Sequence, residues 1–278
     1  MHWAGGGGNQ AQRSSDLRAG FSKYFTVVPA TTQELREACF RIRHDVYCRE
    51  LGFEPVREDG METDSYDAHS VHCLLRATTS GRFVGSIRLI LPDPNDPAKP
   101  YPVEKTCAET INRAIADPRK MPREKLGEVS RLAVIADYRR RKSDQGTPGS
   151  LSDEDFGDEG RPRFPFIPVG LYLGMLVQAL RFGADTLLML TEPRLARHLS
   201  LLGVKIERIG GPVEHRGRRV PSMLNAPGIV GGFGPLVRPL YELIASEVTA
   251  GYGGSQTAHM QAVGLPLVAT SPWGAPAT

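Results

Sequence analysis

The stretch PVGLYLGMLVQALRFGA (168–184), with TLLML (186–190) almost directly after it, limits the choice of fold more than any other part of the chain. The first segment is apolar over the length of a helix and ends at Gly183, a residue type that commonly stops helices. The second segment has the length and the apolar run of a buried strand. An apolar helix that leads into an apolar strand is typical of a sheet covered by helices.

Other segments supply the rest of such a sheet. A helix is expected at 32–47, where apolar residues recur with helical spacing behind a capping box of Thr31 and Glu34. The remaining expected elements are a hairpin with strands at 71–79 and 82–91, a short helix near 106–117, strands at 127–135, 204–210 and 218–224, and helices at 193–203 and 235–248. This order predicts an α/β fold in which helices flank a mixed β-sheet.

Composition restricts the kind of protein. We expect one domain at 25–250 with a charged insert at about 139–163, and flexible tails at 1–24 and 251–278. The net charge of +3 is too small to indicate nucleic-acid binding. The sequence contains no run of about 18 apolar residues, so stable membrane insertion is not expected. The four cysteines lack metal-ligand spacing, so they are interpreted as reduced thiols in a cytoplasmic protein without a metal site.

Charged residues gather at unusual places. The segment ETDSYD (62–67) contains the carboxylates of Glu62, Asp64 and Asp67 and no base. On its predicted strand, Arg88 shares one face with small and apolar residues, and an arginine in such surroundings requires an anionic partner. Arg43 lies off the apolar stripe of the first helix.

The predicted strand 127–135 contains EVSR, in which Glu128 and Arg131 have opposite parity. Both side chains face one cleft only if the pleat breaks between them, as at a β-bulge. A bulge also releases backbone N–H groups from the ladder, and such groups polarise a carbonyl oxygen in acyl transfer.

These motifs resemble a known family. RIRHDVYCRELGF (41–53), ETDSYD, GSIRLI (85–90) and EVSRLAV (128–134) look like the signature of the autoinducer synthase superfamily, which includes acyl-homoserine-lactone synthases and long-chain N-acyl amino acid synthases. The later segment IGGPVEHRGRRVP (209–221) is similar to the exosortase-system-associated acyltransferases of the PEP-CTERM branch. The resemblance implies a GNAT-type fold and a charged cleft made of Arg43, Glu62, Asp64, Asp67, Arg88, Glu128 and Arg131.

The resemblance gives each of these residues an expected role. Catalysis is expected of Glu128 as the base that deprotonates the attacking amine, with Asp64 as the second choice and Arg131 beside them. Binding of a zwitterionic acceptor is expected of a further set, namely Arg43, Glu62, Asp67, Arg88 and Ser130. Three alternatives stay open: an internal ion-pair lattice around Arg43, a structural pair of Glu128 with Arg131, and a turn-forming role for Asp67.

The acyl donor is expected to be acyl carrier protein rather than coenzyme A, with no bound cofactor. GNAT enzymes that use coenzyme A usually follow this strand with a compact loop that binds pyrophosphate, whereas here a basic run precedes the charged insert. This run, Arg139, Arg140, Arg141 and Lys142, would suit an acidic carrier surface, although it is also compatible with a solvated loop.

A tunnel for the acyl chain is expected beside the catalytic strand. Its candidate walls are Leu132, Val134, Leu188 and Leu190, each of which is also compatible with a plain core position. The expected function is therefore transfer of a long-chain acyl group to the amine of an amino acid or a similar small amine. The alternatives are an acyl-homoserine-lactone synthase that uses S-adenosylmethionine, and a non-catalytic acyl-binding module.

Overall fold

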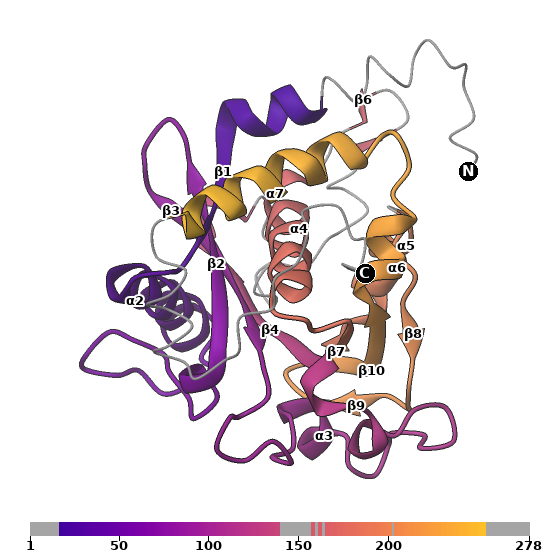
Figure 1. Ribbon diagram of the computed structural model, residues 1–278. Coiled ribbons are helices and arrows are strands. Elements are labelled where there is room, and N and C mark those ends of the chain that lie inside the picture. The colour runs from indigo at the N-terminus through magenta and orange to yellow at the C-terminus, as the bar shows by residue number, and fades with distance from the viewer. Residues whose placement is uncertain (1–16, 140–156, 159–160, 163–164, 202, 254–278) are drawn as a thin grey trace.

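In a computed structural model, the chain is described at residues 17–139, 157–158, 161–162, 165–201 and 203–253 (Figure 1). An 8-stranded sheet runs through the middle. Its strands, in spatial order, are β1 (Phe25–Pro29), β2 (Ser70–Ala77), β3 (Phe83–Ile90), β4 (Leu126–Val134), β7 (Thr186–Thr191), β10 (Arg218–Asn225) and β8 (Glu207–Arg208), with β9 (Val213–Glu214) paired to β10. The β4–β7 pair is parallel and the others are antiparallel, so the predicted mixed sheet is confirmed.

Helices cover both faces of this sheet (Figure 1). On one face lie α4 (Phe166–Arg181) and α7 (Arg238–Tyr252), and on the other lies α2 (Gln33–Arg43), which continues into the π-helical segment His44–Glu50. The two cores follow strand alternation, because Cys73 of β2 belongs to the core under α4 and its neighbour Leu74 to the core under α2. The smaller helices are α3 (Pro102–Thr106), α5 (Pro193–Leu201) and α6 (Ala226–Gly231).

Several boundaries differ from the sequence prediction. The first helix is capped by Thr32 rather than Thr31, because the Thr32 hydroxyl accepts from the backbone N–H of Leu35. Residues 17–24, expected in a flexible tail, are helical, and Phe21 is fully buried against the α4 core. In place of the short helix expected near 106–117, the structure has α3, which already ends at Thr106. Helix α7, expected at 235–248, extends to Tyr252. Strand β1 was not predicted.

Little of the predicted insert at 139–163 falls within the described residues. In it, β5 (Gly157–Asp158) pairs with β6 (Arg161–Pro162). Arg139 is described and pairs with Glu50, whereas the other three members of the basic run, Arg140, Arg141 and Lys142, lie outside the described residues. Within the described parts of the chain, no helix has both the length and the hydropathy needed to span a bilayer.

Strand β4 contains a β-bulge at Arg131, which confirms the predicted break in the pleat. Arg131 has a φ of 53°, and the β3–β4 register shifts between Ser86 and Arg88. The bulge reverses the alternation, because Val129 and Val134, five positions apart, both face the α4 core. It thereby turns the Arg131 side chain to the same side of the sheet as Glu128.

A notch opens between β4 and β7 just beyond the parallel pairing. That pairing ends at Val129 and Met189, after which β4 remains paired with β3 and β7 with β10. The bulge and the notch therefore coincide at the centre of the sheet, and they position the site described next.

Candidate active site

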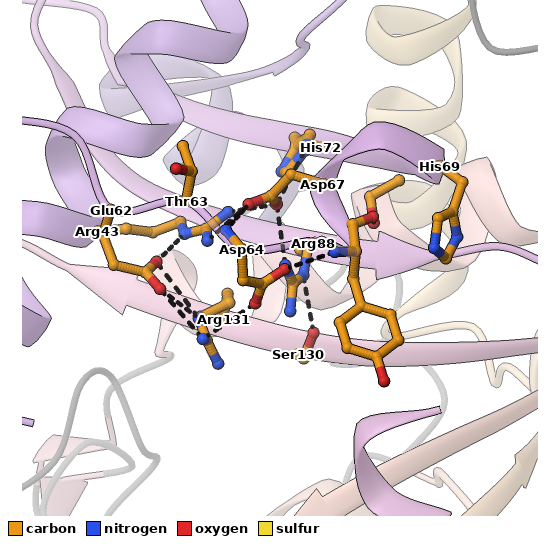
Figure 2. A network of polar contacts seen from close by, with 12 residues as sticks. Arg43, Glu62, Thr63, Asp64, Asp67, His69, His72, Arg88, Ser130 and Arg131 are labelled. Carbon is orange, nitrogen blue, oxygen red and sulfur yellow. Dashed lines mark hydrogen bonds and ion pairs between the residues drawn. The ribbon is translucent and has the colours of Figure 1, made fainter. Parts of the chain in front are cut away.

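Arg43, at the end of α2, anchors a buried network of charges (Figure 2). Its Nε donates to Glu62 at 2.5 Å, and its two Nη atoms donate to the two carboxylate oxygens of Asp67 at 2.7 and 3.0 Å. The loop that carries these carboxylates is fixed locally, because Asp67 also accepts from the backbone N–H of Asp64 at 2.8 Å. Arg43 is 1% exposed, so its bidentate pair with Asp67 is shielded from solvent and holds α2 and the loop together.

Arg88 lies at the centre of this network on β3. Its Nη1 donates to Asp64 at 2.7 Å and to Asp67 at 2.9 Å, and its Nε donates to the Ser130 hydroxyl at 3.1 Å. The residue is completely buried, yet Nη2 has no hydrogen-bond partner among the described residues. Buried donors in native proteins rarely lack a partner, so this nitrogen is an unusual feature of the network.

Arg131 completes the network from the bulge. Its guanidinium donates to Glu62 at 3.1 to 3.3 Å and to Asp64 at 3.1 Å. Three arginines thus meet three carboxylates, and Figure 2 shows the six side chains converging on one another. Burial opposes ionisation of Asp67, but the hydrogen bonds and charges of Arg43 and Arg88 outweigh it and hold the pKa of Asp67 well below its usual range.

The carboxyl of Glu128 has a different environment. It is 3% exposed, and it accepts a hydrogen bond of 2.9 Å from the backbone N–H of Val103. Burial raises the pKa of Glu128 to about 8, against the weaker opposing effects of the Val103 hydrogen bond and the charge of Arg88. A carboxyl with such a pKa takes up a proton near neutral pH, as a general base in amine chemistry must.

A cavity of about 140 Å³ connects these groups through the notch. Glu128, Arg88 and Arg131 line it from the charged side of the sheet. Its other walls come from distant parts of the chain and include Tyr47, Phe53, Val103, Ser130, Leu132, Tyr172, Met189, Leu190, Glu192, His215, Arg216 and Arg219. Glu128 and the network, both singled out from the sequence, thus lie in one region, and the tertiary structure adds the β9–β10 hairpin to it.

A second cavity, of about 40 Å³, is entirely apolar and lies under α4. It is lined by residues of α4, β7, α5, β10 and α6, including Leu187 on β7. Val129, Tyr172 and Met189 line both cavities. The polar cavity and the apolar one are therefore neighbours that share a wall at the notch.

The four predicted acyl-chain residues are distributed differently from the expectation. Leu132 and Leu190 line the polar cavity. Val134 packs in the core under α4, and Leu188 faces the opposite side of the sheet, in the cluster around Tyr101. The reason is strand alternation: on β7 the positions that face α4 are odd-numbered, namely Leu187 and Met189.

Sequence reasoning left several cavity residues without a role. Tyr172 was read only as part of an apolar helix, and Arg216 and Arg219 only as part of a family-like segment. A cation pair beside a glycine turn, as in HRGRR (215–219), is a signal that could have marked the hairpin as functional. His72 is also buried beside the network, and burial lowers its pKa to about 3.

Comparison with known proteins gives the class of this chain. Residues 42–147 match the family model described as acetyltransferase (GNAT) domain, and this stretch contains all six residues of the buried network together with Glu128. The mixed sheet with its central notch agrees with that match. The fold is therefore of the GNAT type, and the protein is an acyltransferase.

Solved structures with the same fold include CoA-dependent acyl-homoserine lactone synthases. TofI, in a ternary complex with an inhibitor and MTA, is 22% identical with a TM-score of 0.50, over 72% of this chain and 91% of TofI. The CoA-dependent acyl-homoserine lactone synthase MesI is 19% identical with a TM-score of 0.50, over 78% and 94%. BjaI, another CoA-dependent synthase, solved with SAM and isopentyl-CoA, is 18% identical with a TM-score of 0.50, over 87% and 90%. No curated protein matches the sequence.

Proposed function

We propose that this enzyme transfers a long-chain acyl group from acyl carrier protein to the amine of an amino acid or a similar small amine. The observation that carries the proposal is the buried Glu128, whose raised pKa suits a base, in a cavity that passes through the notch and adjoins an apolar cavity. Acyl transfer to an amine requires that the thioester, the amine and the base lie close together, and these neighbouring cavities would allow it.

The proposed reaction begins with the protonated amine of the acceptor. Glu128 takes one proton from it, and the neutral nitrogen attacks the thioester carbonyl carbon, which forms the C–N bond. The carbonyl oxygen accepts from the free Nη2 of Arg88 and from a backbone N–H released at the Arg131 bulge. The C–S bond then breaks, and the proton held by Glu128 passes to the departing thiolate. The acylated nitrogen loses its remaining extra proton to the regenerated Glu128 carboxylate, which releases it to solvent.

Asp64 is the weaker candidate for the base. It is bonded to Arg88 and Arg131, and their charges outweigh its burial and lower its pKa, so it has little tendency to accept a proton near neutral pH. We assign Arg43, Glu62 and Asp67 to shaping the cleft, because their charges already satisfy one another. Ser130 orients Arg88 through its hydroxyl.

For the acyl chain we propose the apolar cavity under α4. A chain attached to a carbonyl at the notch would reach this cavity past Val129, Tyr172 and Met189, the residues that line both cavities. A volume of about 40 Å³ accommodates only the beginning of a long chain, so a longer chain must widen the space between α4 and α6.

Acyl carrier protein as donor rests on the basic run from Arg139 and on the lack of a compact pyrophosphate-binding loop in the sequence. Two solved synthases of this fold are described as CoA-dependent, so the fold is compatible with either donor. The advantage of carrier protein should shrink with added salt, because surface charge pairs are screened over about 8–10 Å. Equal efficiency with both donors at low salt would count against the carrier.

The test of the function is product analysis with purified protein. Palmitoyl carrier protein and palmitoyl-CoA are each incubated with the standard amino acids, free thiol is followed, and products are identified by mass spectrometry. An N-acyl amino acid with matching thiol release supports the proposal. A lactone formed only with S-adenosylmethionine would instead make the chain an acyl-homoserine-lactone synthase.

A further inference from the structure

The turn of the β9–β10 hairpin forms one edge of the polar cavity. Two hydrogen bonds to backbone carbonyls fix the turn. The His215 N–H donates to the Gly217 carbonyl at 3.0 Å, and the side-chain Nε of Arg219 donates to the His215 carbonyl at 2.9 Å. Arg216, between them, has a φ of 54°, a conformation uncommon for a residue with a side chain. The backbone therefore holds His215, Arg216 and Arg219 in place, and all three side chains line the cavity.

Glu54 lies between two arginines at this edge. Its carboxylate pairs with Arg216, and it lies 3.6 Å from Arg131 Nη2. Arg216 also stacks over Phe53, with its guanidinium carbon 5.5 Å from the ring centre. One carboxylate of the protein thus bridges a cation of the bulge and a cation of the hairpin.

The bridging pair differs from the buried network in exposure. The side chains of Glu54 and Arg216 are 27% and 23% exposed, whereas that of Arg43 is 1% exposed. Ion pairs in contact with water contribute little to stability, and removing one partner from a buried pair is costly. Another carboxylate can therefore replace that of Glu54 at small cost, but not those of Glu62 or Asp67.

The pairing of the cations also differs between the edge of the cavity and the network. The network arginines are bonded to carboxylates buried in the protein, whereas at the edge Arg216 and Arg219 pair with the partly exposed Glu54 and Glu192. At the edge, His215 reports a positive environment, because burial and then the charges of Arg216, Arg219 and Arg131 lower its pKa even with Glu54 in place. An anion that enters here meets these cations directly.

We infer that Arg216 and Arg131 form the binding site for the carboxylate of the acyl acceptor, and that Glu54 occupies this site in the empty enzyme. The inference rests on the proposed transfer to an amino acid. In an α-amino acid one carbon joins the amine and the carboxylate, so an amine held at Glu128 keeps its carboxylate within the same cavity. The acceptor class is therefore an α-amino acid rather than a simple amine.

The experiment compares matched acceptors. For the wild type, the best acceptor among the standard amino acids is compared with the amine obtained by removing its carboxylate. Arg216→Gln should raise the KM for the amino acid about tenfold or more, with a small change in kcat, and should leave the KM for the amine unchanged. Arg218→Gln is the control, because Arg218 is an exposed arginine of the same hairpin that does not belong to the cavity lining.

Glu54→Gln separates a binding site from a structural ion pair. It should lower the KM for the amino acid severalfold, because it removes the competing carboxylate and leaves both arginines in place. A purely structural pair predicts that Glu54→Gln and Arg216→Gln change KM in the same direction, and that result would overturn the inference. So would an equal rise in KM for the amine and the amino acid in Arg216→Gln.

The two levels of the proposal fail in different ways. If wild-type enzyme with palmitoyl carrier protein or palmitoyl-CoA acylates no amino acid and no amine, the proposed function fails, and the carboxylate site fails with it. If the wild type acylates an amino acid but prefers the matched amine, the function stands and only the carboxylate site is wrong.

Discussion

Glu62 and Glu128 are buried to the same degree, 4% and 3% exposed, at one charged site, and yet their carboxyl groups differ in protonation. The pKa of Glu62 is lowered, because the charges of Arg43 and Arg131 outweigh its burial. Burial raises the pKa of Glu128 to about 8, because the hydrogen bond from the backbone N–H of Val103 and the charges of Arg88 and Arg131 are too weak to offset it. The partners that offset burial thus decide the charge of a buried carboxyl, and here they distinguish the proposed scaffold residue from the proposed base.

The largest expected effect is on stability at the Glu62 side of this comparison. Glu62→Gln removes the shared partner of Arg43 and Arg131 and should lower the free energy of unfolding by about 3–5 kcal/mol, because a buried charge loses its counter-ion. Denaturant unfolding measures it. Glu37→Gln is the control, since its pair with Arg41 is exposed to solvent and should contribute little to stability. Equal losses in the two variants would break the comparison.

A smaller effect, on rate, is expected at the Glu128 side. Glu128→Gln should keep the fold and lower kcat by about 10²-fold or more, because the amide accepts no proton from the amine. Steady-state turnover with circular dichroism as a fold check measures it. A near-wild-type rate would remove Glu128 from catalysis and leave it as a buried structural carboxyl.

The pH dependence of activity sharpens the comparison further. As a base, Glu128 must be ionised, so kcat/KM should rise about tenfold per pH unit below pH 8 and level off above it. The profile is measured with an acceptor amine whose own pKa is known, so that the two ionisations are separated. A rate independent of pH between 6 and 8 would contradict the assignment.

The pH dependence of stability should have opposite signs at the two glutamates. Glu128 has a folded pKa above its unfolded value of 4.5, so ionisation of the unfolded chain lowers stability as pH rises from about 4.5 to 8. Glu62 has a folded pKa below 4.5, so its contribution is present above that value and is lost as pH falls. Glu128→Gln should therefore gain thermal stability over the wild type at pH 8 but not at pH 4. An equal shift at both pH values would show that the pKa of Glu128 is not raised.

The smallest expected effect is on the preferred length of the acyl chain. This chain should contact residues near Glu128 but no residue of the charged network. Met189→Phe should shift the preferred chain by about two carbons, which corresponds to roughly tenfold in affinity at about 0.8 kcal/mol per methylene. Leu188→Phe, on the other face of β7, should leave the preference unchanged. Competition between chain lengths measures it, in variants whose thermal midpoint stays near that of the wild type. An unchanged preference in a folded Met189→Phe would remove the apolar cavity from the proposal.

The sequence indicated the sheet because helix and strand periodicities are local. The long helix α4 was predicted to within three residues at each end and strand β7 to within one, since an apolar run needs no partner to be recognised. Strand β1 was missed because five residues without clear alternation gain their identity only by pairing with β2. Likewise, which face of β7 meets the acyl cavity depends on its neighbours, so Leu188 was chosen where Leu187 and Met189 line the space.

The sequence by itself determined the charged groups of the network and of strand β4: the acidic loop, the two arginines on helix and strand, and the opposite parity of Glu128 and Arg131 that required a bulge. Only the tertiary structure decided how those charges are shared. Whether a carboxylate meets an arginine or a backbone N–H depends on contacts between segments as distant as Glu62 and Arg131, or Val103 and Glu128. Since a pKa follows from those contacts rather than from residue type, the division between scaffold and base could be seen only in the folded chain.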